Sequence, residues 1–422
     1  MSVFIFKNYE FDVKNLTASF RYEFDGGQKF TETVRFDRRA ENYDDELLNR
    51  ALFLAHILIG TSYFKTFPTP NVEIESGKID AWQAEFFNAV FQDGLSQFAY
   101  ENGLTRENLA HFSATTMQAE SALDYDKKGI LALQSGGKDS LLVAAMLGEN
   151  QNTFTPWYVT NSESHPDILD NLGEPLLVAR RQIDKSALST ATQQSALNGH
   201  VPITYIIESL ALVQAILLNK NVVLAAIAHE GEEPYDMIGD LPVTHQWSKT
   251  WQAEKNLSDY VARYISPQIK IGSPLRQHSE LSVAEMFVQK CWQRWGRRFS
   301  SCNVANYRQD TENANLKWCA KCAKCANAWL LFAPFVSADE LKQTFDSGDL
   351  FADPNLVETF KGLLDIDDTP KPFECIGETA ESRVAYHGAM KRSDYQQLDF
   401  HVPESDFDYH AKYEHNGDLT IN

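Results

Sequence analysis

The chain has 422 residues and a formal net charge of −20. Its length allows about two or three domains with a sizeable core, and its acidity argues against nucleic-acid or anionic-membrane partners, which need a basic surface. The N-terminus lacks the basic start and long apolar core of a signal peptide, and the most apolar stretch, residues 51–59, is too short to span a bilayer. We therefore expect a cytoplasmic protein, and no pattern indicates an oligomeric state.

Residues 1–125 are predicted to form a separate α+β domain. Apolar and polar residues alternate on both sides of the turn Asp25-Gly26-Gly27, which is typical of a β-hairpin, and two amphipathic helices with a short strand between them follow. These elements are predicted at residues 16–24, 30–36, 44–64, 72–74 and 81–102. No catalytic constellation occurs here, so we expect the domain to shape a site or act as a scaffold.

From 126 to 335, apolar runs alternate with helical patterns, which indicates an α/β domain with a parallel sheet. Strands are predicted at 129–131, 155–160, 202–207 and 222–228, and helices at 141–147, from Pro166 onward and at 209–219. The C-terminal region, 336–422, is acidic and predicted to be smaller and irregular. It ends in two alternating segments, 399–402 and 406–410, that predict short strands.

The turn Ser135-Gly136-Gly137-Lys138-Asp139-Ser140, between a predicted strand and helix, is the most informative segment. Such a turn forms an anion cradle from backbone N–H groups at a helix N-terminus. The glycines permit close approach, Ser135 and Ser140 offer hydroxyl donors, and Lys138 adds positive charge. Asp139 would repel phosphates unless a divalent cation such as Mg²⁺ lies between them. The sequence therefore predicts a nucleotide polyphosphate site formed by residues 135–140.

A second polar segment, His229-Glu230-Gly231-Glu232-Glu233, follows the predicted strand 222–228. Ligands of parallel sheets bind beyond the carboxyl ends of the strands. We therefore expect this segment and the turn 135–140 to lie at one edge of the sheet. The strand-end position of His229 and Glu232 suits metal or ribose binding.

Four cysteines have the spacing of a metal site: Cys302, Cys319, Cys322 and Cys325. Four thiolates suit tetrahedral Zn²⁺ in a closed structural site. An iron–sulfur cluster and free buried thiols are the alternatives. Cys291 and Cys375 have no such neighbours and are expected to behave as small apolar residues.

The Ser-Gly-Gly-x-Asp-Ser pattern of residues 135–140 resembles the PP-loop ATP pyrophosphatases, which cleave ATP to AMP and pyrophosphate to activate an oxygen of a substrate. Within that superfamily, the 7-cyano-7-deazaguanine synthases share the loop, a segment like 273–281 and a cysteine knot, but lack both flanking regions. The MurL family of UDP-N-acetylmuramoyl-L-alanyl-L-glutamate epimerases is similar over nearly the whole chain. Besides the opening hairpin, the segments that carry this similarity are 60–65, 94–104, 136–140, 243–249, 301–303, 318–325 and 332–335.

The MurL resemblance implies a HUP-type parallel sheet, ATP, Mg²⁺ and a UDP-linked muramoyl dipeptide as substrate. The α-proton beside an ionised carboxylate is barely acidic, so inverting that carbon without a cofactor requires the charge to be masked. Adenylation of the glutamate α-carboxylate masks it, the α-carbon then loses and regains a proton, and water releases the D-glutamyl product with AMP. Such a route needs at least one general base and donors for an enolate-like intermediate.

His245 and Lys249 are candidates for this chemistry, together with Asp139 as the Mg²⁺ ligand. If Thr244 begins a helix, His245 and Lys249 lie one turn apart on one face, and histidine titrates near neutrality. We assign His245 as the base and Lys249 as the ligand of the carboxylate or enolate. In the alternative, this face binds the UDP-sugar without proton transfer, and His229 with Glu232 is the second choice of site. His278 and Glu280 are expected to brace the following helix.

Two other functions share parts of these patterns. A 7-cyano-7-deazaguanine synthase-like enzyme would form an adenylate and end in ammonia transfer. A nucleotide-binding sensor on the same fold would keep the glycines but needs neither Asp139 nor pyrophosphate release.

Overall fold

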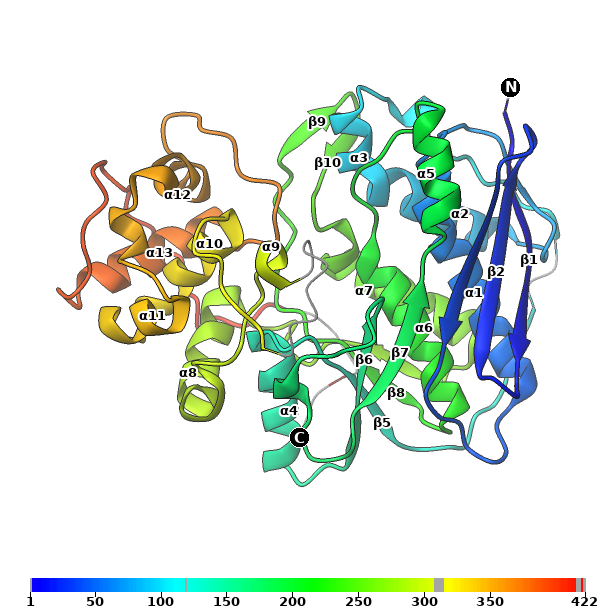
Figure 1. Ribbon diagram of the computed structural model, residues 1–422, viewed down its shortest axis with the longest axis horizontal. Coiled ribbons are helices and arrows are strands. Elements are labelled where there is room, and N and C mark those ends of the chain that lie inside the picture. The colour runs from blue at the N-terminus through cyan, green and yellow to red at the C-terminus, as the bar shows by residue number, and fades with distance from the viewer. Residues whose placement is uncertain (1, 118–119, 307–314, 415–418, 420–422) are drawn as a thin grey trace.

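A computed structural model describes residues 2–117, 120–306, 315–414 and 419 (Figure 1). Within them, the strands are β1 (Phe4–Asp12), β2 (Thr17–Phe24), β3 (Lys29–Arg35), β4 (Val72–Ile74), β5 (Ile130–Leu133), β6 (Phe154–Thr160), β7 (Leu177–Gln182), β8 (Val222–Leu224), β9 (Asp236–Ile238), β10 (Leu241–Val243) and β11 (Lys270–Gly272). The helices are α1 (Asp45–Phe64), α2 (Ala81–Gln92), α3 (Ser96–Glu101), α4 (Lys138–Glu149), α5 (Lys185–Gln193), α6 (Ile203–Leu217), α7 (Trp251–Tyr260), α8 (Glu280–Trp295), α9 (Asn303–Asn306), α10 (Ala323–Phe332), α11 (Ala338–Phe345), α12 (Val357–Leu364) and α13 (Thr379–Met390).

One large sheet organises the described residues, in the order β11-β8-β5-β6-β7-β3-β2-β1-β4. The first five strands of this order run parallel to their neighbours, and β3 joins β7 antiparallel, with Val34 opposite Arg181. The predicted α/β class with a large, mostly parallel sheet is confirmed. The N-terminal hairpin belongs to the same sheet as the strands that follow residue 125. The domain boundaries at 125 and 335 stay a prediction.

The parallel strands are covered on both faces, as expected for a sheet of this kind. Successive residues of β5 point to opposite sides: Leu131 lies in a core with residues of α1 and α6, and Ala132 lies in a core with residues of α4 and α8. The C-terminal helices α10 to α13 pack in the second core and form the lobe at the left of Figure 1. The N-terminal strands lie at the opposite end.

A buried ion pair joins the hairpin to the parallel strands. Arg181 on β7 donates from Nε to Glu32 Oε1 of β3 at 2.5 Å and from Nη2 to Glu32 Oε2 at 3.2 Å. Tyr63 Oη donates to the same carboxylate at 2.8 Å, and Arg181 Nη2 also donates to Ser62 Oγ at 3.0 Å. Because both charged groups have hydrogen-bonding partners, the ion pair can lie inside the protein.

Two predicted elements of the central region are wrong. Residues 202–207 are the beginning of α6, which follows Pro202, and are not a strand. A short apolar run does not distinguish a buried strand from a buried helix. After Pro166 there is one short turn of 3₁₀ helix, Asp167–Leu169, and the chain then enters β7. The sequence patterns predict neither β7 nor β1.

The C-terminal region is helical where it was expected to be irregular. Three helices, α11, α12 and α13, follow α10 in the second core, and the strands predicted at 399–402 and 406–410 are wrong. Its aspartates end helices: Asp346 and Asp365 adopt left-handed conformations with φ of 49° and 54° at the C-caps of α11 and α12. In short helices, capping aspartates give the sequence the polar composition that is typical of a loop.

The apolar stretch 51–59 lies inside α1, which has 20 residues. Among the described residues, α1 is the one helix long and apolar enough to cross a membrane, and 83% of its most apolar window is buried inside the protein. The helix packs against α6. Its apolar character is therefore explained by its place in the core.

The Glu32–Arg181 pair gives a stability prediction. Arg181→Ala leaves a buried carboxylate without its partner, and we expect the free energy of unfolding to fall by about 3–5 kcal/mol. The double variant Glu32→Gln/Arg181→Met removes both charges, and we expect it to recover most of that loss. Urea denaturation measures both.

Arg180→Ala is the matched control for this experiment. Arg180 neighbours Arg181 on β7 and pairs with Glu163, whose side chain is 77% exposed, so its loss should cost less than about 1 kcal/mol. Equal destabilisation by the two alanine variants would contradict the buried-pair account.

Candidate functional site

A cavity of about 770 Å³ lies at the carboxyl ends of the parallel strands. The turns that follow β5, β6 and β8 line it, and β7 contributes Arg181. The first turns of α6, the side chain of Lys249 and parts of the segment 301–324 complete the wall. This is the place where ligands of parallel sheets bind.

The turn after β5 suits an anion. Gly136 has a φ of +79°, and a Cβ there would lie 2.5 Å from Leu316 Cδ1, so only glycine fits. Gly137 is the N-cap of α4. Ser135 Oγ and Ser140 Oγ lie 3.3 Å apart, and Ser135 Oγ accepts a hydrogen bond from Gly137 N at 3.3 Å. The positive end of the α4 dipole therefore lies at the cavity.

Lys138 lies between two carboxylates. Its Nζ donates to Asp139 Oδ1 at 2.7 Å and to Glu280 Oε2 at 2.6 Å, and the Lys138 and Glu280 side chains are only 10% and 9% exposed. Burial would lower the pKa of Lys138, but the two carboxylates outweigh it and raise that pKa. Burial also raises the pKa of Glu280. Glu280, expected only to brace a helix, is thus bound to the glycine turn.

Lys249, the last residue of the 3₁₀ turn Trp247–Lys249, lines the cavity and donates to Glu230 Oε2 at 3.1 Å. Burial would lower the pKa of Lys249, but Cys375 and Glu230 outweigh it and raise that pKa. Glu230 is buried as well, and the charges of Lys249 and Lys138 lower its pKa. The expected convergence of the segment 229–233 on the turn 135–140 therefore holds for Glu230. Lys249 presents a charged ammonium group to the cavity.

His245 is placed differently from the expectation. Thr244 does not begin a helix: β10 ends at Val243, and α7 begins at Trp251 after a 3₁₀ turn, Trp247–Lys249. The common helical face of His245 and Lys249 is therefore wrong. His245 is also not among the described residues that line the cavity, whereas Lys249 is.

The contacts of His245 favour one tautomer. Nδ1 lies 2.5 Å from Gln97 Oε1, and Nε2 lies 3.8 Å from Cys375 Sγ. Because an amide oxygen only accepts, this pairing assigns the proton to Nδ1 and leaves Nε2 as an acceptor facing the thiol. Burial lowers the pKa of His245 to about 4, so the ring is neutral at neutral pH. Cys375, expected to be a small apolar residue, is a neighbour of this ring.

His229 and Glu232, the second choice of site residues, contact residues that do not line the cavity. The ring of His229 stacks on Tyr413 with centroids 3.4 Å apart, and its Nε2 lies 3.9 Å from Glu378 Oε1. Glu232 Oε1 accepts a hydrogen bond from Trp251 N at 2.7 Å. Neither residue is among the described residues that line the cavity.

Glu208 lines the cavity but is not among the site residues predicted from the sequence. It lies on α6 and is 2% exposed. The available signal was its position as the single charged residue of Ile203–Leu217. Because the sequence predicts a strand at 202–207 and a helix at 209–219, Glu208 lies between two predicted elements.

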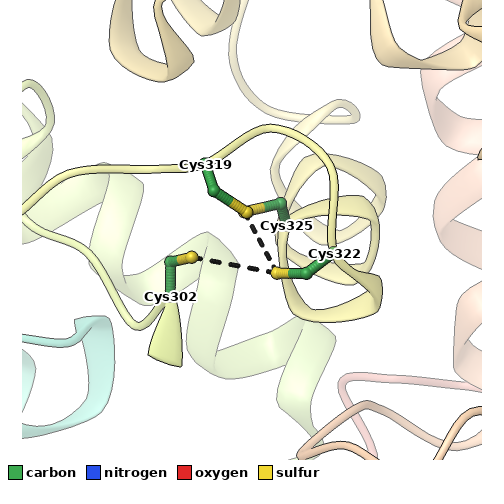
Figure 2. Close-up of side chains that lie close together, drawn as sticks. All are labelled: Cys302, Cys319, Cys322 and Cys325. Carbon is green, nitrogen blue, oxygen red and sulfur yellow. Dashed lines mark hydrogen bonds between the residues drawn. The ribbon is translucent and has the colours of Figure 1, made fainter. Parts of the chain in front are cut away.

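The four clustered cysteines form a compact set, and Figure 2 shows their side chains pointing toward one another. All four Sγ atoms lie within 4.8 Å of one another, with contacts of 3.8 Å for Cys302–Cys322, 3.6 Å for Cys319–Cys325 and 3.5 Å for Cys322–Cys325. Tetrahedral Zn²⁺ with Zn–S bonds of about 2.3 Å separates its sulfurs by about 3.8 Å. The set therefore fits one tetrahedral ion, with all four positions taken by protein.

The cysteine set is tied to the glycine turn. Cys302 immediately follows Ser301, which lines the cavity, and Lys324 lies between Cys322 and Cys325 and also lines it. Ser300 N donates to Gly136 O at 3.3 Å. An ion on the four thiolates would therefore fix one wall of the cavity without taking part in its chemistry.

Metal content tests this interpretation. Elemental analysis of the purified protein should give about one zinc per chain, and Cys322→Ser should lose the metal and lower the melting temperature, because metal binding adds to folding free energy. Cys291→Ala, at a cysteine buried outside the set, should keep its metal. Iron with sulfide, or full metal content in Cys322→Ser, would contradict the zinc site.

Comparison with known proteins identifies the family. Residues 1–273 match the MurL N-terminal domain, and residues 298–408 match the MurL C-terminal domain. A Xanthomonas oryzae pv. oryzae protein named UDP-N-acetyl-alpha-D-muramoyl-L-alanyl-L-glutamate epimerase is 33% identical over 404 residues, which cover 94% of this chain and 88% of that protein. Proteins of the same name from Salinispora tropica and a Micromonospora species are each 31% identical over 91% of this chain, and the matches cover 84% and 86% of their lengths. The resemblance seen in the sequence is confirmed, and the chain belongs to the MurL family.

Proposed function

We propose that this chain is an ATP-dependent epimerase that inverts the terminal L-glutamate of UDP-MurNAc-L-Ala-L-Glu to D-glutamate in peptidoglycan precursor synthesis. The observation that carries the proposal is the shared name of three relatives that match 91% to 94% of the chain. The proposal keeps the cytoplasmic location expected from the sequence, with AMP and pyrophosphate as the other products.

The nucleotide part of the proposal is supported by the turn 135–140. Its glycine conformation, its two facing hydroxyls and the N-terminus of α4 suit the phosphates of ATP. The five parallel strands that carry it are compatible with a PP-loop fold of the HUP type. Asp139 is the one carboxylate of this turn, and we assign it to Mg²⁺ on the phosphates. Its present partner, the Lys138 ammonium, would then be available to the phosphates.

Adenylation explains why an epimerase needs ATP. The glutamate α-carboxylate attacks the α-phosphorus of ATP, an acyl-adenylate forms and pyrophosphate leaves. The α-hydrogen of this mixed anhydride is far more acidic than that of a carboxylate, because the enolate is not formed beside an existing negative charge. After the proton has been removed and returned, water cleaves the anhydride to the product and AMP.

Lys249 is assigned to the developing enolate oxygen or the carboxylate, because its ammonium group lines the cavity and stays charged. His245 is assigned as the base. Its neutral ring has an acceptor nitrogen, Nε2, that faces Cys375. Neither His245 nor Cys375 is among the described residues that line the cavity, so the assignment requires His245 to approach the substrate when it binds.

Three readouts test the function on the full chain. With UDP-MurNAc-L-Ala-L-Glu, ATP and Mg²⁺, we expect substrate-dependent exchange of labelled pyrophosphate into ATP, deuterium entry at the glutamate α-carbon in D₂O, and D-glutamate on chiral analysis. Asp139→Asn should lower the exchange by about 10²-fold or more, because it removes the cavity carboxylate that we assign to Mg²⁺.

The alternative substrate class is the control for this experiment. A carboxylated deazapurine with ammonia should give no AMP. AMP formation with the deazapurine and none with the muramoyl dipeptide would show a different enzyme.

His245 has its own test. His245→Ala and His245→Gln should retain pyrophosphate exchange within a few-fold but lose about 10²–10⁴-fold in deuterium entry, the usual contribution of a general base. His111→Gln, at an exposed histidine, serves as the matched control and should leave both rates unchanged. Full deuterium entry in either His245 variant would rule out the assignment.

A further inference from the structure

Glu208 is an acidic side chain on a helix that is otherwise apolar. α6 runs from Ile203 to Leu217, and Glu208 is its one charged residue. Ile203, Thr204, Ile207 and Glu208 line the cavity, which is the spacing of one helical face. The helix therefore presents a single carboxyl group to the same cavity as the turn 135–140 and Lys249.

Four other buried carboxylates around the site have cationic partners. Glu32 is bound by Arg181, Glu230 by Lys249, Glu254 by Arg276 and Glu280 by Lys138. Glu208 makes no hydrogen bond or ion pair with any residue in the part of the chain that the structure describes, although it is only 2% exposed. A buried acid without a partner is costly to keep, unless it has a ligand to meet.

The surroundings of Glu208 favour its protonated form. Burial is the main cause that raises the pKa of Glu208 to about 8, the charge of Glu254 on α7 adds to it, and Arg276 opposes it. The hydroxyl of Tyr205, one turn earlier on α6, donates to Ala253 O and does not reach the carboxyl as a partner. At neutral pH this acid carries a proton and can give it up, which is the range that suits general acid–base catalysis.

We propose that Glu208 is a second proton-transfer residue of this site, which delivers the proton to the α-carbon of the activated glutamate. The inference rests on the proposed function. Inversion of the α-carbon explains why two proton-transfer groups are needed. A base that returns the proton it has taken restores the L-configuration. A proton from a different group can reach the other face of the α-carbon.

The step balances in protons and electrons. The base takes the α-proton, and the electron pair of the broken C–H bond moves into the enolate of the acyl-adenylate. The O–H bond of Glu208 then breaks, its proton bonds to the α-carbon through the enolate electron pair, and Glu208 is left as a carboxylate. Exchange with water returns the base and Glu208 to their starting states.

Glu208→Gln in the full-length protein separates this role from binding. The change keeps the shape of the side chain, removes the acid and breaks no described contact. We expect pyrophosphate exchange within about three-fold of the unsubstituted protein, continued deuterium entry into recovered L-substrate, and a fall of about 10²–10⁴-fold in D-glutamate formation. Glu149→Gln, at an exposed glutamate paired with Lys290 at the far end of α4, should leave all three unchanged.

Each other outcome overturns the inference. Undiminished D-glutamate formation would show that Glu208 is not used. Loss of pyrophosphate exchange would make Glu208 a ligand of ribose or Mg²⁺, and loss of deuterium entry with intact exchange would make it the first base. Absence of exchange in the unsubstituted protein would be a failure of the proposed function itself, so the two failures are distinguishable.

Discussion

The contact between Lys138 and Glu280 sets the geometry of the site. Each residue is the first of its helix, α4 and α8, so a 2.6 Å ion pair holds two helix N-termini together, and the two helices pack along their length. After α8 the chain reaches Ser300, whose N–H donates to Gly136 O, and then Cys302. One buried charge contact, which water cannot screen, therefore joins the glycine turn to the helix that leads to the cysteine set.

The N-terminal strands have a direct part in the same site. Arg181 lines the cavity and is held by Glu32 of the hairpin, while Tyr63 of α1 binds the same carboxylate. His245 is held by Gln97 of α3, which also comes from the first hundred residues. Residues 1–117 thus support cavity groups from behind and contribute no described lining residue of their own.

Local signals predicted the parts of the molecule that depend on neighbours in sequence. The hairpin, the strand–turn–helix around Gly136 and the cysteine spacing were all confirmed as structural features, because turn chemistry and side-chain periodicity are properties of short segments. Glu280 and Glu208 could not be assigned in this way. The role of Glu280 depends on Lys138, which is 142 residues away in the sequence, and the role of Glu208 depends on a cavity formed by several strands. For His245, the error was a helix predicted from spacing alone, where β10 and a 3₁₀ turn occur.

The strand order has a consequence for the behaviour of the protein in concentrated solution. Long open edge strands offer rows of unpaired backbone groups to other chains and promote aggregation. Here the two outermost strands, β11 and β4, have three residues each. The hairpin covers β7, a six-residue strand that would otherwise be an edge of the parallel sheet. By extending the sheet to a shorter edge, the N-terminal strands protect the parallel part of the sheet from edge-to-edge association.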